Sequence, residues 1–385
     1  MNDLYAVNVV QDILLEAINL GASDIHCEPE ETGLRIRFRI DGVLYDKMVI
    51  QLDYGLQVVS RIKVMAQVNV AEKRLPQDGK LSLQINSNII DLRVSTFPTL
   101  LGEKVVIRIL DRERNSISLE SLGFESGMLE KFKKLSQSSN GFFLVTGPTG
   151  SGKTTTLYSV LSVLNSPEKN IITLEDPIEY KISGITQGQI NADIGFTFER
   201  GIRALLRQDP DIIMVGEIRD RENAEVAIQA SLTGHLVLST LHTNDAISAV
   251  MRLIDMGIES FLVKAALTGV LAQRLARKLC QDCKYKTNLE EYEFSLLKKF
   301  NIILDGCYKS KGCSNCNGLG YKGRVGIFSL LEFSEKFRSL VNQNPQFELL
   351  YEQALKDGMK PLIYDAALKV SSGIISVSEL IRTVL

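Results

Sequence analysis

Residues 142–155 read Phe-Phe-Leu-Val-Thr-Gly-Pro-Thr-Gly-Ser-Gly-Lys-Thr-Thr, a hydrophobic run followed by a glycine-rich loop. Residues 155–164 continue with apolar side chains at helical spacing, so we expect the loop to join a strand to a helix. Glycines let backbone N–H groups converge on phosphate oxygens, and the start of a helix adds the positive end of its dipole. The stretch therefore predicts a site for a nucleoside triphosphate such as ATP.

Each part of the loop has an expected role. Lys153 is expected to reach the β- and γ-phosphates, and the Thr154 hydroxyl to hold Mg²⁺. The alternative is a glycine-rich turn without a ligand, which the full match in a strand–loop–helix context disfavours. The residues expected to bind the nucleotide are Gly147, Pro148, Thr149, Gly150, Ser151, Gly152, Lys153, Thr154 and Thr155.

Two further hydrophobic runs end in acids, at Glu175-Asp176 and at Glu217. Parallel strands deliver their carboxyl ends to one edge of a sheet, so these acids are expected on the same edge as the loop. Glu217 suits a Walker B element that contacts Mg²⁺ or its waters, and either Glu175 or Glu217 could orient or deprotonate the attacking water. The alternative for each acid is a solvated strand end.

His242 follows the apolar run 236–240, at the edge where a sensor of the γ-phosphate would sit. A lone histidine is more often structural, so this role depends on its neighbours. Strand alternation is expected to send His235 and Val237 to one face of the sheet and Leu236 and Leu238 to the other.

The periodicity predicts two domains and a linker. Residues 1–110 combine a helix over 4–20, alternating strands such as 34–40, a hairpin turn at Asp41-Gly42 and a helix over 53–68, which indicates a small α+β domain. The polar stretch 111–122 is interpreted as a linker. From 123 to 385, short apolar runs at 142–146, 170–174, 211–215 and 236–240 alternate with helical stretches, which predicts an α/β domain with a mainly parallel sheet and a helical tail.

Composition narrows the function classes. The chain has 385 residues and a formal net charge of −2, so no electrostatic argument favours direct nucleic-acid binding. Neither a signal peptide nor an apolar stretch long enough for a transmembrane segment is visible. We therefore expect a cytoplasmic protein that reaches the inner face of a membrane only through partners.

Four of the six cysteines form two C-x-x-C pairs. A disulfide framework is not expected in a large intracellular chain, whereas paired thiolates can chelate Zn²⁺ tetrahedrally. The alternative is four reduced free thiols. We predict a zinc-binding segment over about 278–320, and Cys27 and Cys307 are interpreted as spare thiols. The predicted ligands are Cys280, Cys283, Cys313 and Cys316.

Taken together, these residues resemble the secretion ATPases of the type II secretion and type IV pilus assembly class. Four boxes match in order: the loop at 147–155, Thr-Leu-Glu-Asp-Pro-Ile-Glu-Tyr at 173–180, Arg207–Asp211 running into Gly216–Asp220, and Gly234–Asp245. The first domain adds matching stretches at 21–26, 39–42, 74–79 and 91–95. The similarity covers nearly the whole chain.

The resemblance implies a RecA-like P-loop domain preceded by a PAS-like domain, and a homohexamer that binds ATP between the two domains. It also implies that Glu217 is the Walker B acid, Glu175 a catalytic or water-positioning acid and His242 a phosphate sensor. Arg93 and Arg108 of the first domain would neutralise γ-phosphate charge, a role that suits a planar guanidinium. Arg35, Arg37 and Arg39 are interpreted instead as a solvated strand face.

Two features bear on the subclass. Assembly and secretion ATPases of this family commonly carry a tetracysteine insertion that retraction motors lack, so the cysteines favour assembly. Larger members carry an additional N-terminal domain that docks on an inner-membrane platform protein, and we interpret this chain as lacking it. The remaining alternatives are a motor for DNA uptake or retraction, and a nucleotide-gated zinc scaffold without useful turnover.

Overall fold

The computed structural model describes residues 2–85, 88–110 and 117–385. The chain divides after Asn115 into two compact units. The predicted first domain, 1–110, falls in the first unit, and the predicted second domain, 123–385, falls in the second unit. The first six residues of the predicted linker, 111–116, lie outside the described residues.

The structure differs from the expected linker at residues 117–122. Leu119–Leu122 form the short 3-10 helix η2, in which Leu119 is fully buried and Leu122 nearly so. Both leucines join a hydrophobic cluster that includes Leu157 and Leu161 of the helix after the glycine-rich loop. A 3-10 helix has three residues per turn, so Leu119 and Leu122 lie on the same side of it. The polar residues around these two leucines hid this anchor in the sequence.

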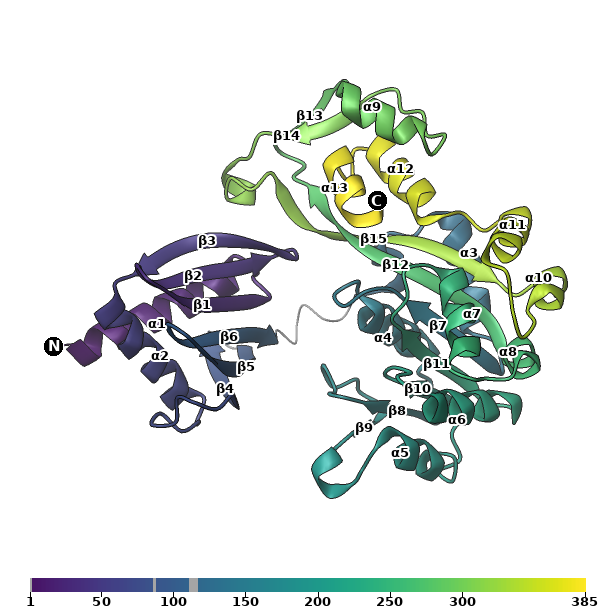
Figure 1. Cartoon of the computed structure of the whole chain (residues 1–385), viewed down its shortest axis with the longest axis horizontal. Helices are drawn as coiled ribbons and strands as arrows, with labels where there is room; N and C mark the ends of the chain where they lie inside the picture. The colour runs from purple at the N-terminus through teal and green to yellow at the C-terminus, as the bar shows by residue number, and fades with distance from the viewer. Residues whose placement is uncertain (1, 86–87, 111–116) are drawn as a thin grey trace. The chain divides into compact units, whose positions relative to one another are not determined.

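The first unit is a six-stranded antiparallel sheet with two helices (Figure 1). The strand order is β3-β2-β1-β6-β5-β4. Apolar residues spaced along α1 and α2 are buried, as the helical periodicity predicts. The elements are α1 (Asn2–Asn19), β1 (Asp24–Glu30), β2 (Gly33–Ile40), β3 (Val43–Ile50), α2 (Leu52–Met65), β4 (Gln77–Ile85), β5 (Asn88–Thr99) and β6 (Gly102–Leu110).

Strand β2 confirms the alternation read from its sequence. Leu34, Ile36, Phe38 and Ile40 are buried, while the three arginines between them are partly exposed. These arginines are not merely solvated: each pairs with an acid of a neighbouring strand. The pairs are Arg35 with Glu30 at 3.0 Å and Asp46 at 2.6 Å, Arg37 with Glu28 at 2.6 Å, and Arg39 with Asp24 at 3.7 Å.

The second unit is built on a seven-stranded sheet of order β15-β12-β7-β11-β10-β8-β9. Every neighbouring pair is parallel except β12 with β15, so the prediction of a mainly parallel sheet is confirmed. The strands are β7 (Gly141–Thr146), β8 (Ile171–Glu175), β9 (Thr186–Gln189), β10 (Ile212–Val215), β11 (Leu236–Leu241), β12 (Leu267–Leu279) and β15 (Tyr321–Glu332).

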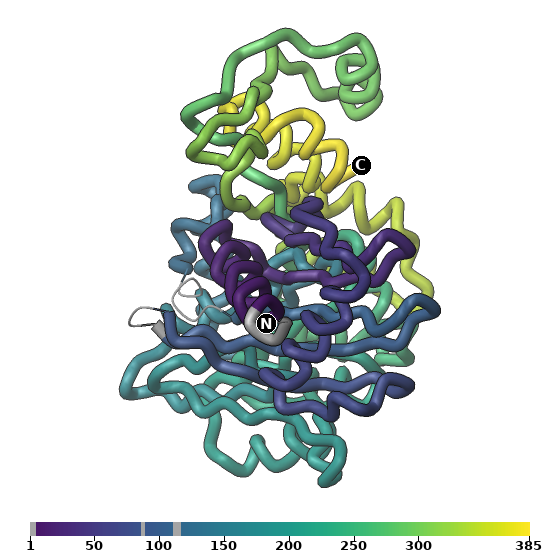
Figure 2. The backbone as a smooth tube through the Cα atoms, turned by 90° about the vertical axis from the view of Figure 1, so that its left-hand side faces the viewer, coloured from purple at the N-terminus to yellow at the C-terminus, as the bar shows by residue number. Residues whose placement is uncertain are grey.

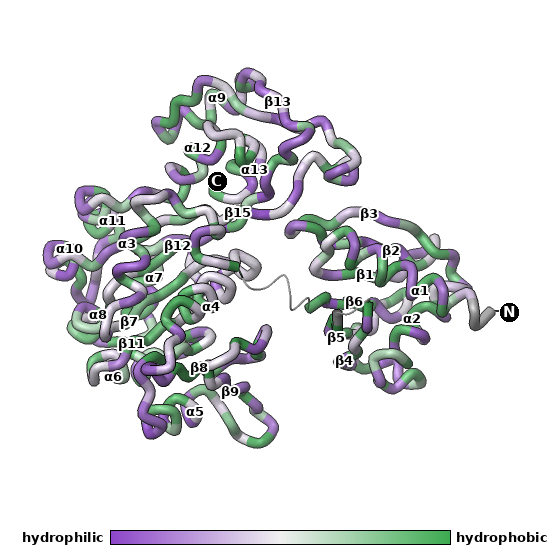
Figure 3. Tube along the Cα trace, turned by 180° about the vertical axis from the view of Figure 1, so that it is seen from behind, coloured by the Kyte–Doolittle hydropathy of each residue, from purple (hydrophilic) through white to green (hydrophobic). Residues whose placement is uncertain are grey.

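Helices cover both faces of this sheet, and the central strands β7 and β11 are buried along their whole length and mostly hydrophobic, as the green stretches of Figure 3 show. Phe142 and Leu144 of β7 face one hydrophobic cluster, whereas Phe143 and Val145 face the other. The helices are α3 (Ser126–Ser136), α4 (Lys153–Leu164), η3 (Ala192–Ile194), α5 (Phe198–Leu205), α6 (Arg221–Leu232), α7 (Ala246–Asp255), α8 (Ser260–Ala266), α10 (Glu335–Leu340) and α11 (Phe347–Lys356).

Two predictions about individual strands can be compared with this packing. Val237 joins one cluster and Leu236 and Leu238 join the other, so the alternation expected for β11 is confirmed. Strand β12 runs as far as Leu279, into the start of the predicted zinc-binding segment, because it pairs with β15 up to Tyr321.

The cysteine-bearing segment and the C-terminal helices lie together beyond the end of β12 (Figures 1 and 2). A third hydrophobic cluster joins them, with Cys307, Val370 and Leu380 among its buried members. The elements are β13 (Lys284–Thr287), α9 (Glu291–Lys298), β14 (Cys307–Ser310), η4 (Ser314–Cys316), α12 (Leu362–Ser371) and α13 (Val377–Val384).

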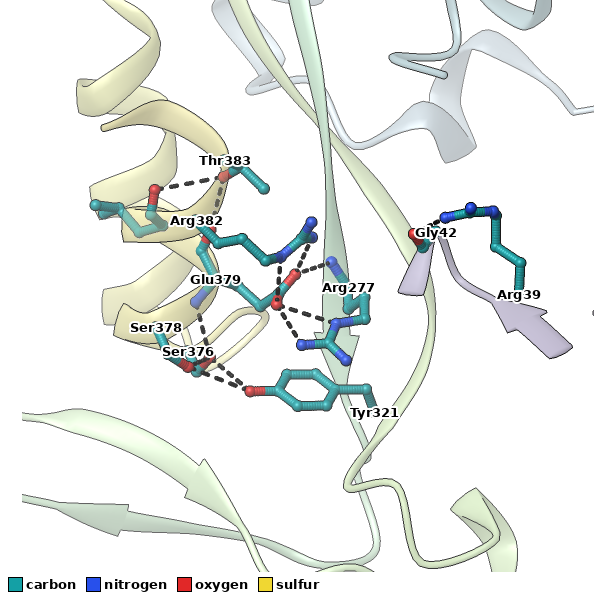
Figure 4. Close-up of polar contacts among 10 residues, drawn as sticks. Arg39, Gly42, Arg277, Tyr321, Ser376, Ser378, Glu379, Arg382 and Thr383 are labelled. Atoms are coloured by element: carbon teal, nitrogen blue, oxygen red, sulfur yellow. Dashed lines mark hydrogen bonds and ion pairs between the residues drawn. The ribbon is translucent and has the colours of Figure 1, made fainter. Parts of the chain in front are cut away.

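Glu379 anchors α13 to strand β12 (Figure 4). Its buried carboxylate accepts hydrogen bonds from the Arg277 guanidinium at 2.6 Å and from the Arg277 backbone N–H at 2.9 Å, and from Arg382 at 2.6 Å. Burial alone would raise the pKa of Glu379, but the hydrogen bonds from Arg382 and Arg277 outweigh it and lower that pKa to about 2. The Arg277 guanidinium also stacks on Tyr321, 4.1 Å from the ring centre, so β12, β15 and α13 form one rigid corner.

Among the described residues, no helix is both long enough and apolar enough to cross a membrane.

Candidate functional site

The glycine-rich loop lies between β7 and α4, as the sequence predicts. Gly147, Gly150 and Gly152 have φ angles of 153°, 79° and 87°, in the region that favours glycine. A side chain at Gly147 would also collide with the Gln273 carbonyl oxygen, which lies 2.4 Å from the position of a Cβ atom. The backbone of the loop is therefore held in a tight curve that other residues would not adopt.

Lys153 begins α4 and turns back into the loop. Its Nζ donates hydrogen bonds to the Gly147 carbonyl at 2.9 Å and the Pro148 carbonyl at 3.1 Å, and the residue is 9% exposed. Burial lowers the pKa of Lys153 to about 8, which the charge of Glu217 opposes and that of Arg274 assists. The loop thus surrounds a largely desolvated cation, and such a cation is stabilised by an anionic ligand.

The remaining loop residues fit a phosphate ligand. Pro148, Thr149 and Gly150 are exposed at the tip, while Thr154 and Thr155 are partly exposed in the first turn of α4. In the described part of the chain, the Ser151 hydroxyl is one of the few buried polar groups without a hydrogen-bond partner. A buried hydroxyl in this state costs free energy that a phosphate oxygen would recover.

Two of the predicted residues meet at the carboxyl edge of the sheet. Glu217 follows β10, His242 follows β11, and the His242 Nε2 atom lies 3.3 Å from the Glu217 Oε2 atom. Arg219 donates to the other Glu217 oxygen, Oε1, from its Nε at 2.7 Å. Glu217 also lies close enough to Lys153 for its charge to act on that ammonium. Lys153, Glu217 and His242 therefore lie together at the carboxyl edge, as a parallel sheet predicts.

Glu175 lies in a different environment. Only 3% of it is exposed, and its carboxylate accepts hydrogen bonds from the Tyr158 hydroxyl, from Thr173 at 2.6 Å and from the Gln187 amide at 3.2 Å. Burial raises the pKa of Glu175, although these hydrogen bonds oppose the shift. A raised pKa makes this carboxylate a better proton acceptor than an exposed one. Glu217, in contrast, is an acid among cations.

Arg93 and Arg108 face each other on strands β5 and β6 of the first unit. The side chain of Arg108 is 62% exposed, and its Nε donates to Asp24 at 3.0 Å. The two arginines thus lie side by side on one face of the antiparallel sheet. Their action on a phosphate stays a prediction.

The four predicted cysteine ligands converge, with sulfur atoms all within 4.8 Å of one another. Cys280 and Cys313 have sulfurs 3.7 Å apart, and the Cys283 and Cys316 sulfurs are 3.8 Å apart. A tetrahedral ion with Zn–S bonds of about 2.3 Å would place its sulfurs about 3.8 Å from one another, so the spacing fits zinc. Backbone N–H groups of Cys313 and Gly320 each donate to the Cys316 sulfur at 3.2 Å, which favours a thiolate. Cys27 and Cys307 are buried elsewhere.

Two residues of β12 that no sequence motif marked, Gln273 and Arg274, reach the loops at this edge of the sheet. The Gln273 amide donates to the Ser151 carbonyl at 2.8 Å, and Arg274 donates to the Asn244 carbonyl at 2.7 Å. The available signal was a polar pair that interrupts the apolar run 267–275 of a buried strand.

Comparison with known proteins decides the family. The family model described as "Type II/IV secretion system protein" matches residues 2–382. The chain belongs to this family. It is 49% identical over 388 residues to the type II secretion system ATPase E of Vibrio cholerae, covering 99% of this chain and 76% of that protein. It is 47% identical over 386 residues to the type IV pilus assembly ATPase TfpB of Acinetobacter baylyi, covering 100% of this chain and 66% of that protein.

A solved structure agrees with this assignment. The crystal structure of the pilus retraction motor PilT with bound ADP matches with a TM-score of 0.63 and 26% sequence identity, over 96% of this chain and 95% of that one. The secretion ATPase family, its ATPase activity and the mixed α/β fold of this chain are therefore established.

The pKa of Lys153 predicts how ATP hydrolysis depends on pH. Protonated Lys153 is the form that attracts a phosphate, and its pKa of about 8 in the free protein lies within the neutral-to-basic range. The value of kcat/KM for ATP, which reports the free enzyme, should therefore fall as pH rises through about 8. Steady-state hydrolysis rates measured on both sides of this pH test the prediction. Lys153→Arg keeps its charge throughout, so the fall should disappear in that variant; a flat profile in the unaltered protein would contradict the argument.

Proposed function

We propose that this ATPase is a motor that couples ATP hydrolysis to assembly of a type IV pilus or of a type II secretion pseudopilus. The observation that supports this most is the meeting of Lys153, Glu217 and His242 at the carboxyl edge of a parallel sheet, beside a loop that fits a phosphate. In this proposal the second unit is a RecA-like P-loop domain and the first unit is a PAS-like domain.

The loop would bind the triphosphate of ATP. Its backbone N–H groups and the start of α4 would surround the phosphate oxygens, and Lys153 would exchange its contacts to the Gly147 and Pro148 carbonyls for the β- and γ-phosphates. Thr154 and Glu217 would hold Mg²⁺, directly or through water. When bound, Mg²⁺ would neutralise charge that develops on the transferred phosphoryl group.

His242 and Glu175 would have different roles in ATP hydrolysis. His242 is held at 3.3 Å from Glu217, and we propose that it senses the γ-phosphate from this position. Glu175, with its raised pKa, would accept a proton from the attacking water. Because Glu175 is enclosed by Tyr158, Thr173 and Gln187, water reaches it only when one of these partners moves.

The proposal includes a homohexameric ring, which the family assignment supports. In this arrangement Arg93 and Arg108 of the first unit would neutralise γ-phosphate charge, and each subunit would close on binding ATP and open after hydrolysis. Nucleotide can drive such a closure only through different affinities for the open and closed states. The ring would work in the cytoplasm, attached to an inner-membrane platform protein.

Zinc would be held by Cys280, Cys283, Cys313 and Cys316. Through these ligands it would fasten the end of β12 to the turn before β15, and its binding free energy would add to the stability of this segment.

Turnover tests the motor proposal. Lys153→Ala removes the phosphate-binding ammonium, so the steady-state release of phosphate from ATP should fall by about a hundredfold or more. Lys169→Ala is the matched control, since Lys169 is an exposed lysine before β8, at the opposite edge of the sheet. Equal rates of phosphate release in the unaltered protein and in Lys153→Ala would contradict the motor proposal and favour a nucleotide-gated scaffold.

Metal analysis tests the cysteine cluster. The purified protein should contain about one zinc ion per chain, because four thiolates complete one tetrahedral site. The double variant Cys280→Ser and Cys313→Ser should lose that zinc, whereas Cys307→Ala, which removes a buried thiol outside the cluster, should keep it. Full zinc content in the double variant would refute the ligand assignment.

Loss of the gene distinguishes assembly from retraction. An assembly motor builds filaments, so its deletion should remove the surface filaments or block secretion, while deletion of a retraction motor leaves excess filaments. Complementation with the unaltered gene and with Lys153→Ala provides the control. Excess filaments in the deletion strain would overturn the assembly proposal.

A further inference from the structure

Gln273 is buried in the middle of strand β12, with 1% of it exposed. An amide in such a place costs free energy unless both of its halves form hydrogen bonds. Both halves do, and both bonds reach the phosphate-binding region. The Nε2 atom donates to the Ser151 carbonyl at 2.8 Å, and the Oε1 atom accepts from the Thr156 hydroxyl at 2.8 Å.

These two bonds span the point where the loop becomes helix α4. Ser151 precedes the start of α4 and Thr156 lies in its first turn, so one side chain fixes the loop relative to the helix. The same strand also limits the loop sterically. A Cβ atom at Gly147 would lie 2.4 Å from the Gln273 carbonyl oxygen, and one at Gly152 would lie 2.9 Å from the Gln273 amide nitrogen.

Arg274, the next residue, reaches the loop that follows β11. Its Nη2 atom donates to the Asn244 carbonyl at 2.7 Å, and its Nη1 atom donates to the Gln273 carbonyl at 3.1 Å. Asn244 comes two residues after His242, and the intervening Thr243 is bound through its N–H to the Thr146 hydroxyl at 3.1 Å. The segment 242–244 is therefore held from two sides, by the end of β7 and by β12.

We propose that Gln273 and Arg274 are positioning residues of the ATP site, one for the phosphate loop and the other for the segment that carries His242. This inference rests on the ATP site proposed above. Consecutive residues of a strand point to opposite faces, so β12 can hold both loops at once and fix the distance between them. Strand β12 would form equally well with apolar side chains at positions 273 and 274. The hydrogen bonds of Gln273 and Arg274 are therefore best explained by the loops that they reach.

The proposal predicts different kinetic effects for the two residues. Gln273→Met keeps the volume but removes both hydrogen bonds, so the loop should lose its curvature and the Kd for Mg·ADP should rise by about ten- to a hundredfold. Arg274→Lys keeps the charge but cannot bridge two carbonyls, so kcat should fall by about tenfold while the Kd for Mg·ADP changes little.

Two further variants keep the test sharp. Thr156→Val removes one of the two Gln273 bonds and should raise the Kd for Mg·ADP by about two- to tenfold, even where Gln273→Met fails to fold. Gln229→Met, the same change at an exposed position on α6, should leave the Kd and kcat as they are.

The measurements are the Kd for Mg·ADP by titration calorimetry, and kcat and KM by phosphate release, with the nucleotide-free melting temperature alongside. A purely structural role would lower the melting temperature and leave these constants unchanged. An inactive Lys153→Ala, together with unaltered Kd in Gln273→Met and Thr156→Val and unaltered kcat in Arg274→Lys, would overturn this inference alone. An active Lys153→Ala would overturn the ATP site and this inference together.

Discussion

The parallel strands β7, β8, β10 and β11 bury both of their faces, and this two-sided packing fixes where the chemistry of the molecule lies. Because the strands run in the same direction, their carboxyl ends meet at one edge, and the glycine-rich loop, Glu217 and the His242 segment leave the sheet there. The loops themselves contribute little hydrophobic contact, so their geometry depends on the rigid strands beneath them.

Much of this could be predicted from residues alone. The strand–loop–helix pattern and the hydrophobic runs ending in acids identified the loop and the convergence of Glu217 with His242, since strand direction determines which ends meet. The spacing of two C-x-x-C pairs was enough to predict the cysteine cluster. The sequence could not show which side chains, distant in the chain, hold these loops in place. Gln273 lies more than a hundred residues from Ser151 in the chain, and the closed network around Glu175 joins three separate elements. The buried anchor at Leu119 was hidden by polar neighbours.

Glu175 and Glu217 both lie at the carboxyl ends of parallel strands, but their surroundings differ. Glu217 is partly exposed, its Oε1 atom accepts a hydrogen bond from Arg219, and its Oε2 atom lies 3.3 Å from the His242 Nε2 atom. Glu175 is enclosed by neutral hydrogen-bonding groups, and burial raises its pKa. One sheet edge therefore carries two carboxylates in different surroundings, one beside a guanidinium and the other enclosed by neutral groups. The ammonium group of Lys153 lies at the same edge and is largely desolvated, so a bound anion would stabilise its positive charge.

Hydrogen–deuterium exchange with and without Mg·ATP tests most directly whether this edge is the nucleotide site. Binding should protect the backbone amides of residues 147–156 and of the segments around Glu217 and His242, since the ligand would order these loops on the strand ends. Lys153→Ala should abolish that protection. Unchanged exchange in these segments at saturating nucleotide, or protection confined to other parts of the chain, would contradict the account.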